Sequence, residues 1–129
     1  MAKKEVMYTS YFPFKKSEIR CTQKKVNHLL YALRNIVKKV ILEGHIIVSN
    51  EDLPIILKEL PVHIQNTKAE NGCLIFMVQQ QEHNPNKLTV YEEFIDMEAF
   101  ELHQIRVKSS QWGRVTINVE RHYHITEVA

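Results

Sequence analysis

The sequence is poor in cysteine and has no long apolar segment, and both absences restrict the class of protein it can encode. Cys21 and Cys73 are its only cysteines. Their separation matches neither a CxxC motif nor a zinc-binding spacing, so we expect no disulfide framework and no zinc site. No apolar run approaches the roughly 20 residues that span a bilayer, and the N-terminus lacks the apolar segment of a secretory signal. The default prediction is therefore a cytoplasmic protein.

Charge is distributed unevenly along the 129 residues, although the net charge is only +2. Residues 1–39 contain ten Lys or Arg and two acids, which makes this part +8. Residues 40–129 contain seven Lys or Arg and thirteen acids, which makes that part −6. The split predicts a basic N-terminal extension at 1–39 and one folded domain at 40–129.

From residue 40 onward, the hydrophobic pattern alternates between strand and helix periods. Asn50 and Asp96 are each placed to cap a helix, Asn71-Gly72 is placed to end the first, and Gly113 is placed to help end the second. This order is the ferredoxin-like βαββαβ pattern, an α+β fold with two helices on one face of a four-stranded antiparallel sheet. The predicted elements are a strand at 40–49, a helix with apolar residues from 53 to 67, strands at 73–80 and 87–95, a helix from about 97 to about 111, and a strand at about 116–127.

The strand at 73–80 is apolar on both of its alternating faces. Leu74, Phe76 and Val78 form one set, and Ile75 and Met77 form the other. Because both helices cover one face of the sheet, the second apolar face needs another cover. A homodimer packed through the sheet face is the simplest expectation. Residues 40–129 give no indication of a nucleic-acid or membrane partner.

Two ionisable residues fall where the pattern predicts core, in the stretch VYEEFIDMEAFELH (90–103). Glu92 alternates with Val90 and Phe94 on its strand, and His103 shares a helix stripe with Phe100. A carboxyl group buried among apolar side chains has a raised pKa, and a neighbouring imidazole could share its proton. Such a pair suits proton abstraction from a phenol or an enol. The alternative is a satisfied polar pair in a small core.

An ordered set of short motifs resembles the antibiotic biosynthesis monooxygenase superfamily, whose members are dimeric α+β barrel proteins. The resemblance covers about residues 40–129, and the segment from 110 to 114 is similar to a bacterial branch labelled quinol monooxygenase. One departure is Lys108, where family members often carry a second aromatic residue or histidine. The motifs are Glu70-Asn71-Gly72-Cys73-Leu74, Tyr91-Glu92, Ala99-Phe100-x-x-His103 and Ser110-x-Trp112-Gly113-Arg114.

The resemblance implies a cofactor-independent, metal-free monooxygenase that uses O2 to oxidise a small electron-rich aromatic such as a quinol. His103 is the expected general base or proton shuttle, and Glu92 is expected to assist it. The expected substrate pocket consists of Trp112, Phe100, Tyr91 and His45, and the alternative for His45 is a position at the dimer interface. Members of the superfamily also degrade haem, isomerise small metabolites or have no known activity, so fold alone does not select a reaction. The alternatives are an isomerase or tautomerase of an enolisable metabolite, and a non-catalytic ligand-binding dimer.

Several competing interpretations concern single residues. Adjacent Glu93 leaves the facing of Glu92 open, because a shift of one residue reverses it. Trp112 is also a candidate core residue. His122 and His124 share a strand face, but no third metal ligand lies at a defined spacing. The remaining assignments are His63 and His83 as surface positions.

The basic extension has an amphipathic pattern that begins after Ser17, a candidate helix cap. A helix from about residue 17 would pack on its own domain or on a dimer partner, which is the simplest interpretation. Its charge also suits an anionic membrane surface or nucleic acid, and a transit peptide is a further alternative. Val40 is a further candidate translation start, in which case 1–39 is not part of the native protein.

Overall fold

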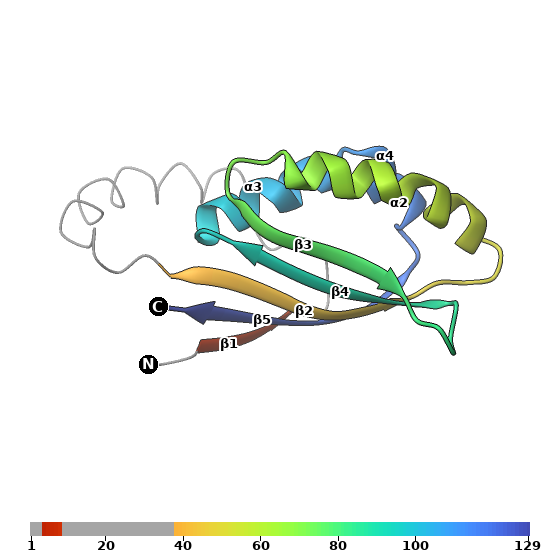
Figure 1. Cartoon of the computed structure of the whole chain (residues 1–129), viewed down its shortest axis with the longest axis horizontal. Coiled ribbons are helices and arrows are strands. Elements are labelled where there is room, and N and C mark those ends of the chain that lie inside the picture. Colours follow the sequence, from red (N-terminus) through yellow and green to blue (C-terminus); the bar gives the residue numbers. More distant parts are fainter. Residues whose placement is uncertain (1–3, 9–37) are drawn as a thin grey trace.

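One antiparallel sheet of five strands, in the order β1-β5-β2-β4-β3, carries the helices on one of its faces (Figure 1). The computed structural model describes residues 4–8 and 38–129. The strands are β1 (Lys4–Tyr8), β2 (Lys39–Ile47), β3 (Cys73–Gln80), β4 (Lys87–Phe94) and β5 (Glu120–Val128). The helices are α2 (Leu53–Lys68), α3 (Met97–Lys108) and α4 (Gln111–Val115).

The core lies between the helices and the inner face of the sheet, which is the face that the helices cover. Successive side chains of a strand point to opposite faces, and the inner set on β2 and β4 is almost entirely apolar. The predicted ferredoxin-like α+β arrangement is thereby confirmed, with β2, β4, β3 and β5 as its four strands. The fully buried members of this set include Val40, Leu42, Ile46, Leu88 and Phe94.

Strand β1 was not predicted, and it extends the sheet by pairing antiparallel with β5, from Lys4 opposite Glu127 to Tyr8 opposite Tyr123. Residues 9–37 lie outside the described part, so the predicted helix from about residue 17 stays a prediction. None of the helices in the described ranges is long and apolar enough to cross a membrane.

The predicted second helix, at 97–111, is in fact two helices. Helix α3 ends at Lys108, and the hydroxyl of Ser110 accepts a hydrogen bond from the backbone N–H of Gly113 at 3.1 Å, which caps α4. Gly113 does not end a helix but lies inside α4, where a Cβ atom would be 2.2 Å from the carbonyl oxygen of Val107. This extra helical turn delays the last strand, which begins at Glu120 and not at about 116.

The two predicted helix caps have different outcomes. Asp96 accepts a hydrogen bond from the backbone N–H of Ala99 at 2.8 Å, so its role as the α3 cap is confirmed. Asn50 does not cap α2, because its side-chain oxygen accepts a hydrogen bond from the Asn86 amide at 2.8 Å. Residue 52 occupies the cap position without a side-chain hydrogen bond.

The alternation predicted that Leu74 would share a face with Phe76 and Val78. This prediction is wrong. The pairing of β3 with β4 shifts register between Cys73 and Ile75, and the side chain of Leu74 is 53% exposed. Such an irregularity reorients the side chains next to it. Ile75 and Met77 are also exposed, so the outer face of this edge strand is apolar.

Candidate active site

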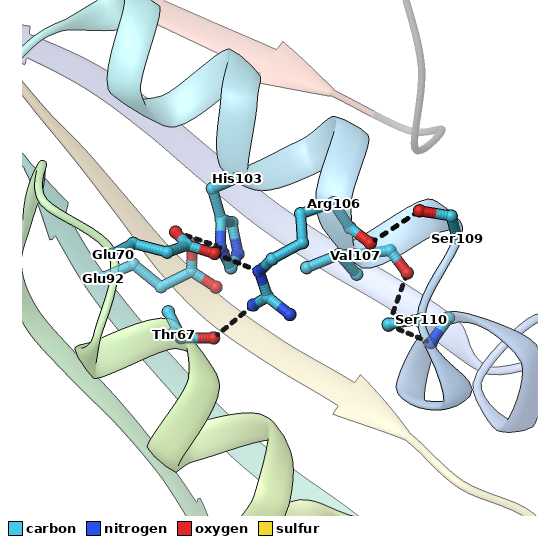
Figure 2. Close-up of polar contacts among 9 residues, drawn as sticks. Thr67, Glu70, Glu92, His103, Arg106, Val107, Ser109 and Ser110 are labelled. Atoms are coloured by element: carbon cyan, nitrogen blue, oxygen red, sulfur yellow. Dashed lines mark hydrogen bonds and ion pairs between the residues drawn. The ribbon is translucent and has the colours of Figure 1, made fainter.

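His103 lies on the buried side of α3 with a carboxyl group near each of its ring nitrogens (Figure 2). Its Nδ1 is 3.0 Å from Oε2 of Glu70, and its Nε2 is 3.9 Å from Oε2 of Glu92. The first distance is a hydrogen bond, and the second is too long for one. The side chain is 3% exposed, and its ring centroid is 4.9 Å from that of Phe94. The predicted pair of His103 and Glu92 is therefore brought together, with Glu70 as a third member.

Glu70 follows α2 and is held in place by His103 and Arg106 (Figure 2). Arg106 donates from Nε to Glu70 and from Nη2 to the hydroxyl of Thr67 at 3.0 Å. Burial by itself would raise the pKa of Glu70, but the hydrogen bonds and charges of His103 and Arg106 lower it. Since an ionised carboxylate can only accept hydrogen bonds, Nδ1 of His103 carries a hydrogen. In the neutral ring, Nε2 is then the unprotonated nitrogen, and it faces Glu92.

Glu92 points to the inner face of β4, between Leu42 of β2 and Phe76 of β3. Burial raises the pKa of Glu92 to about 7; the positive charge of His103 opposes this rise and the negative charge of Glu70 adds to it. Its Oε2 has no hydrogen-bond partner in the described part of the chain. A carboxyl group with a pKa near neutrality can both accept and release a proton at physiological pH.

A small cavity of about 20 Å³ lies between the sheet and the helices, beside Glu92. We call it the inner cavity. It is large enough for one water molecule or one hydroxyl group. Its walls combine apolar side chains with a few polar groups, a composition typical of ligand sites. Its lining residues include Phe76, Val90, Glu92, His63, Trp112 and Arg121.

His63 forms one wall of the inner cavity, although the sequence analysis placed it on the surface. That assignment is wrong, because the side chain is only 5% exposed. Its ring stacks on Trp112, with centroids 4.5 Å apart and planes 3° apart. Burial, followed by the positive charges of His103 and Arg106, lowers the pKa of His63 to about 3, so the ring is neutral at physiological pH. The overlooked signal was the spacing of Ile56, His63 and Thr67, which is the buried stripe of α2.

A second, larger depression opens on the other side of His103. This groove of about 460 Å³ lies between α3 and the turn that leads into β3. Glu70, His103 and Arg106 line it together with apolar groups such as Leu102 and Ala99. Gly72 belongs to the same wall, where a Cβ atom would be 2.2 Å from that of Ala99. His103 thus lies between an open groove that contains Glu70 and an inner cavity that contains Glu92.

The structure does not bring all of the predicted pocket residues to this site. Trp112 lines the inner cavity, but Phe100 packs against Phe94 in the core, with ring centroids 5.7 Å apart. Tyr91 is on the outer face of the sheet, where its hydroxyl donates to Glu93 at 2.6 Å. His45 is also on the outer face and stacks on His122 at 4.6 Å.

Strand alternation is the physical reason why Tyr91 and His45 point away from the inner cavity. Residues directly next to Glu92 must point away from it, so Tyr91 and Glu93 cannot reach the inner cavity. The same alternation along β2 turns His45 away while Ile46 faces inward. Across residues 38–129, no three His, Cys, Asp or Glu side chains form a group that could hold a metal ion.

Comparisons with known proteins agree with this architecture. The family model described as antibiotic biosynthesis monooxygenase matches residues 40–112. No curated protein sequence matches the chain. The similar solved structures are all below 25% identity to this chain, so their likeness concerns the fold alone. Similar structures include PA3566 from Pseudomonas aeruginosa, at 18% identity and a TM-score of 0.54 over 72% of this chain and 93% of that one. SO0527 from Shewanella oneidensis has 21% identity and a TM-score of 0.53 over 73% and 96%. A Bacteroides thetaiotaomicron protein described as a possible oxidoreductase has 11% identity and a TM-score of 0.59 over 71% and 99%.

Proposed function

The chain belongs to the antibiotic biosynthesis monooxygenase family and has its monooxygenase-like fold, and we propose that it oxidises a small electron-rich aromatic, such as a quinol, with O2 and without a cofactor. One observation carries the proposal. Glu92 is a buried carboxyl group with an unpartnered oxygen beside a cavity, 3.9 Å from the imidazole of His103. A structural ion pair alone would leave no reason for that unpartnered oxygen.

Proton transfer is the step that the site residues perform. The ionised carboxylate of Glu92 accepts the hydroxyl proton of the substrate and becomes the neutral acid. Nε2 of His103 is the nearest basic nitrogen, and its position is set by the hydrogen bond from Nδ1 to Glu70. From Glu92 the proton passes to Nε2 of His103, and the imidazole, which also lines the open groove, releases a proton to solvent on that side. Glu92 is then ionised again and can accept a proton in the next turnover.

The oxygen step needs no further group from the protein. The phenolate passes one electron to O2, which forms a phenoxyl radical and superoxide, and these combine in a new C–O bond. Cleavage of the O–O bond leaves one oxygen atom on the ring as a quinone carbonyl. The other oxygen leaves as water, which takes the hydrogen of the oxygenated carbon and one proton from solvent, in exchange for the hydroxyl proton released earlier. O2 takes up four electrons in total. Two come from the broken O–H bond and two from the broken C–H bond of the substrate.

The size of the inner cavity defines how a ring could bind. About 20 Å³ accommodates the hydroxyl group but not the ring. We expect the hydroxyl to occupy the space beside Glu92 and the ring to displace side chains at the cavity wall, against the stacked Trp112 and His63. Flat aromatic walls suit an aromatic substrate.

Oxygen uptake with a panel of quinols tests the proposal. His103→Gln and Glu92→Gln should each lower the rate by about a hundredfold or more, because this is the usual cost of losing a general base. His83→Gln is the matched control, since His83 is exposed in a turn and should leave the rate unchanged. If all three variants keep the wild-type rate, or if no quinol supports oxygen uptake, the proposal is wrong.

The small volume of the inner cavity favours a second candidate, an isomerase or tautomerase of a small enolisable metabolite. The same proton transfer between substrate, Glu92 and His103 would serve that reaction. Product formation without oxygen consumption would identify it.

We also propose a homodimer through the outer face of the sheet, because Ile75 and Met77 are exposed on the edge strand β3. Sedimentation velocity should give twice the monomer mass, and Met77→Lys should shift the protein toward monomer. A wild-type protein that is monomeric at all concentrations tested would contradict the dimer.

A further inference from the structure

His63 has a buried polar atom that the proposed proton transfer leaves unexplained. Its Nδ1 is buried and has no hydrogen-bond partner in the described part of the chain. Buried polar groups in folded proteins are nearly always satisfied, and an unsatisfied one costs about 1–3 kcal/mol. The buried stripe of α2, in which His63 lies between Ile56 and Thr67, supplies no hydrogen-bond partner for this atom.

The unpartnered atom of His63 belongs to a residue that lines the same cavity as Glu92, whose Oε2 is also buried and unpartnered. Both side chains are more than nine-tenths buried, at 5% and 6% exposure. Two residues with such atoms, from the different elements α2 and β4, line one water-sized space, which indicates a site for a polar guest.

We propose that His63 is a substrate-binding residue whose Nδ1–H donates a hydrogen bond to the hydroxyl oxygen of a phenol or enol while Glu92 accepts its proton. This inference rests on the proposed function, because it concerns the same site and the same proton. It specifies the substrate class as one that carries an acidic hydroxyl group and develops negative charge on that oxygen.

The two residues have complementary roles in the transfer. When the proton leaves the hydroxyl, the O–H bond breaks, its electron pair stays on oxygen, and the Glu92 carboxylate becomes a carboxylic acid. The new oxyanion then faces the His63 N–H, and hydrogen bonds to charged acceptors are stronger than those to neutral ones. Because His63 is neutral at physiological pH, it can donate this hydrogen bond without adding a buried positive charge.

The stack on Trp112 explains how the donor is held in position. Ring planes only 3° apart at 4.5 Å fix the orientation of the imidazole, and the edge-on contact with Phe76 at 5.2 Å limits its movement on another side. A donor that is already oriented stabilises a developing charge better than one that must reorganise.

The test measures binding and ionisation of a probe, without any turnover. 4-Nitrophenol absorbs differently as phenol and as phenolate, so a titration reports both its affinity and its ionisation on the protein. Nitrobenzene has the same ring and nitro group without the hydroxyl, and serves as the matched control ligand. The protein variants are His63→Phe, which keeps a ring against Trp112 but has no N–H, and His63→Leu, which only fills the volume.

We expect the wild-type protein to bind 4-nitrophenol as the phenolate at a lower pH than the free compound ionises. Both variants should bind the phenolate about tenfold more weakly or worse, which is the loss expected for one hydrogen bond to a charged group. Their affinity for nitrobenzene should stay the same or increase. Their melting temperatures should equal or exceed that of the wild type, because an unsatisfied buried polar group has been removed.

Equal phenolate affinity in the wild type and both variants would overturn the inference, as would equal losses for phenolate and nitrobenzene. Failure of the inference about His63 can be distinguished from failure of the proposed monooxygenase function. Phenolate binding that depends on His63 without oxygen uptake would leave the inference intact and reject the monooxygenase. Oxygen uptake that is unchanged in His63→Phe would reject the role of His63 and leave the monooxygenase proposal intact.

Discussion

Glu92→Gln should stabilise the folded protein at neutral and alkaline pH, and the gain should disappear in acid. Folding raises the pKa of the Glu92 carboxyl from its ordinary 4.5 to about 7. At about pH 8 the group is ionised in both states, so folding must bury the charge. The difference between the two pKa values corresponds to a loss of about 3 kcal/mol in the free energy of unfolding, at 1.36 kcal/mol per pKa unit. Near pH 4.5 and below, both states bind the proton and the penalty is gone. Stability of the native protein through this group therefore falls as pH rises from about 4.5 to about 7.

Glutamine has nearly the same shape and no charge, so the variant should lack this pH dependence. Urea unfolding of both proteins at several pH values between about 5 and 8 gives the difference in free energy of unfolding. We expect that difference to move in favour of the variant by about 2 kcal/mol or more across this range. Any constant cost of the buried amide cancels in the comparison.

Glu93→Gln is the matched control, since it changes the neighbouring residue on the opposite face of the sheet. The hydrogen bond from Tyr91 and the ion pair with Lys39 lower the pKa of Glu93, against a smaller opposing effect of burial. A lowered pKa contributes stability that is lost only below the ordinary range, so this control should be flat between about pH 5 and 8. A Glu92→Gln difference that is also flat over this range would refute the reasoning.

The remaining predictions concern local contacts. Gly44→Ala should destabilise the sheet by more than about 3 kcal/mol in urea unfolding, because its φ is +156° and a Cβ atom would lie 1.8 Å from the His122 carbonyl oxygen. Unchanged stability would contradict this close approach of β2 to β5 at Gly44. Asp96→Ala should cost about 1 kcal/mol by removing the α3 cap on Ala99, and Asp96→Asn should restore most of it. Glu70→Gln should destabilise the protein at neutral pH by about 1–3 kcal/mol, because it removes the charge that faces an imidazole and a guanidinium. Since the pKa of Glu70 is lowered in the folded state, this loss should shrink as pH falls below about 4.5, and a loss that persists in acid would contradict the electrostatic cause.

Local patterns in the sequence were enough to predict the order of strands and helices, the Asp96 cap and the burial of His103. Each depends on neighbours two to four residues away, which periodicity and capping chemistry describe. The resemblance to the family was equally readable, and the family match over residues 40–112 confirms it. The break between α3 and α4 was missed because Ser110, which caps α4 through the Gly113 N–H, was not recognised as the start of a new helix.

The composition of the site was decided by tertiary structure. Register within the sheet turned Glu92 inward and Tyr91 outward, although the sequence allowed either facing. Packing of α2 on the sheet buried His63 against Trp112, which is 49 positions away in the sequence. Glu70 reaches His103 across 33 positions, because the turn before β3 lies against α3. Periodicity in the sequence shows which side of its own element a residue occupies, whereas the partners it meets there depend on how the elements pack together.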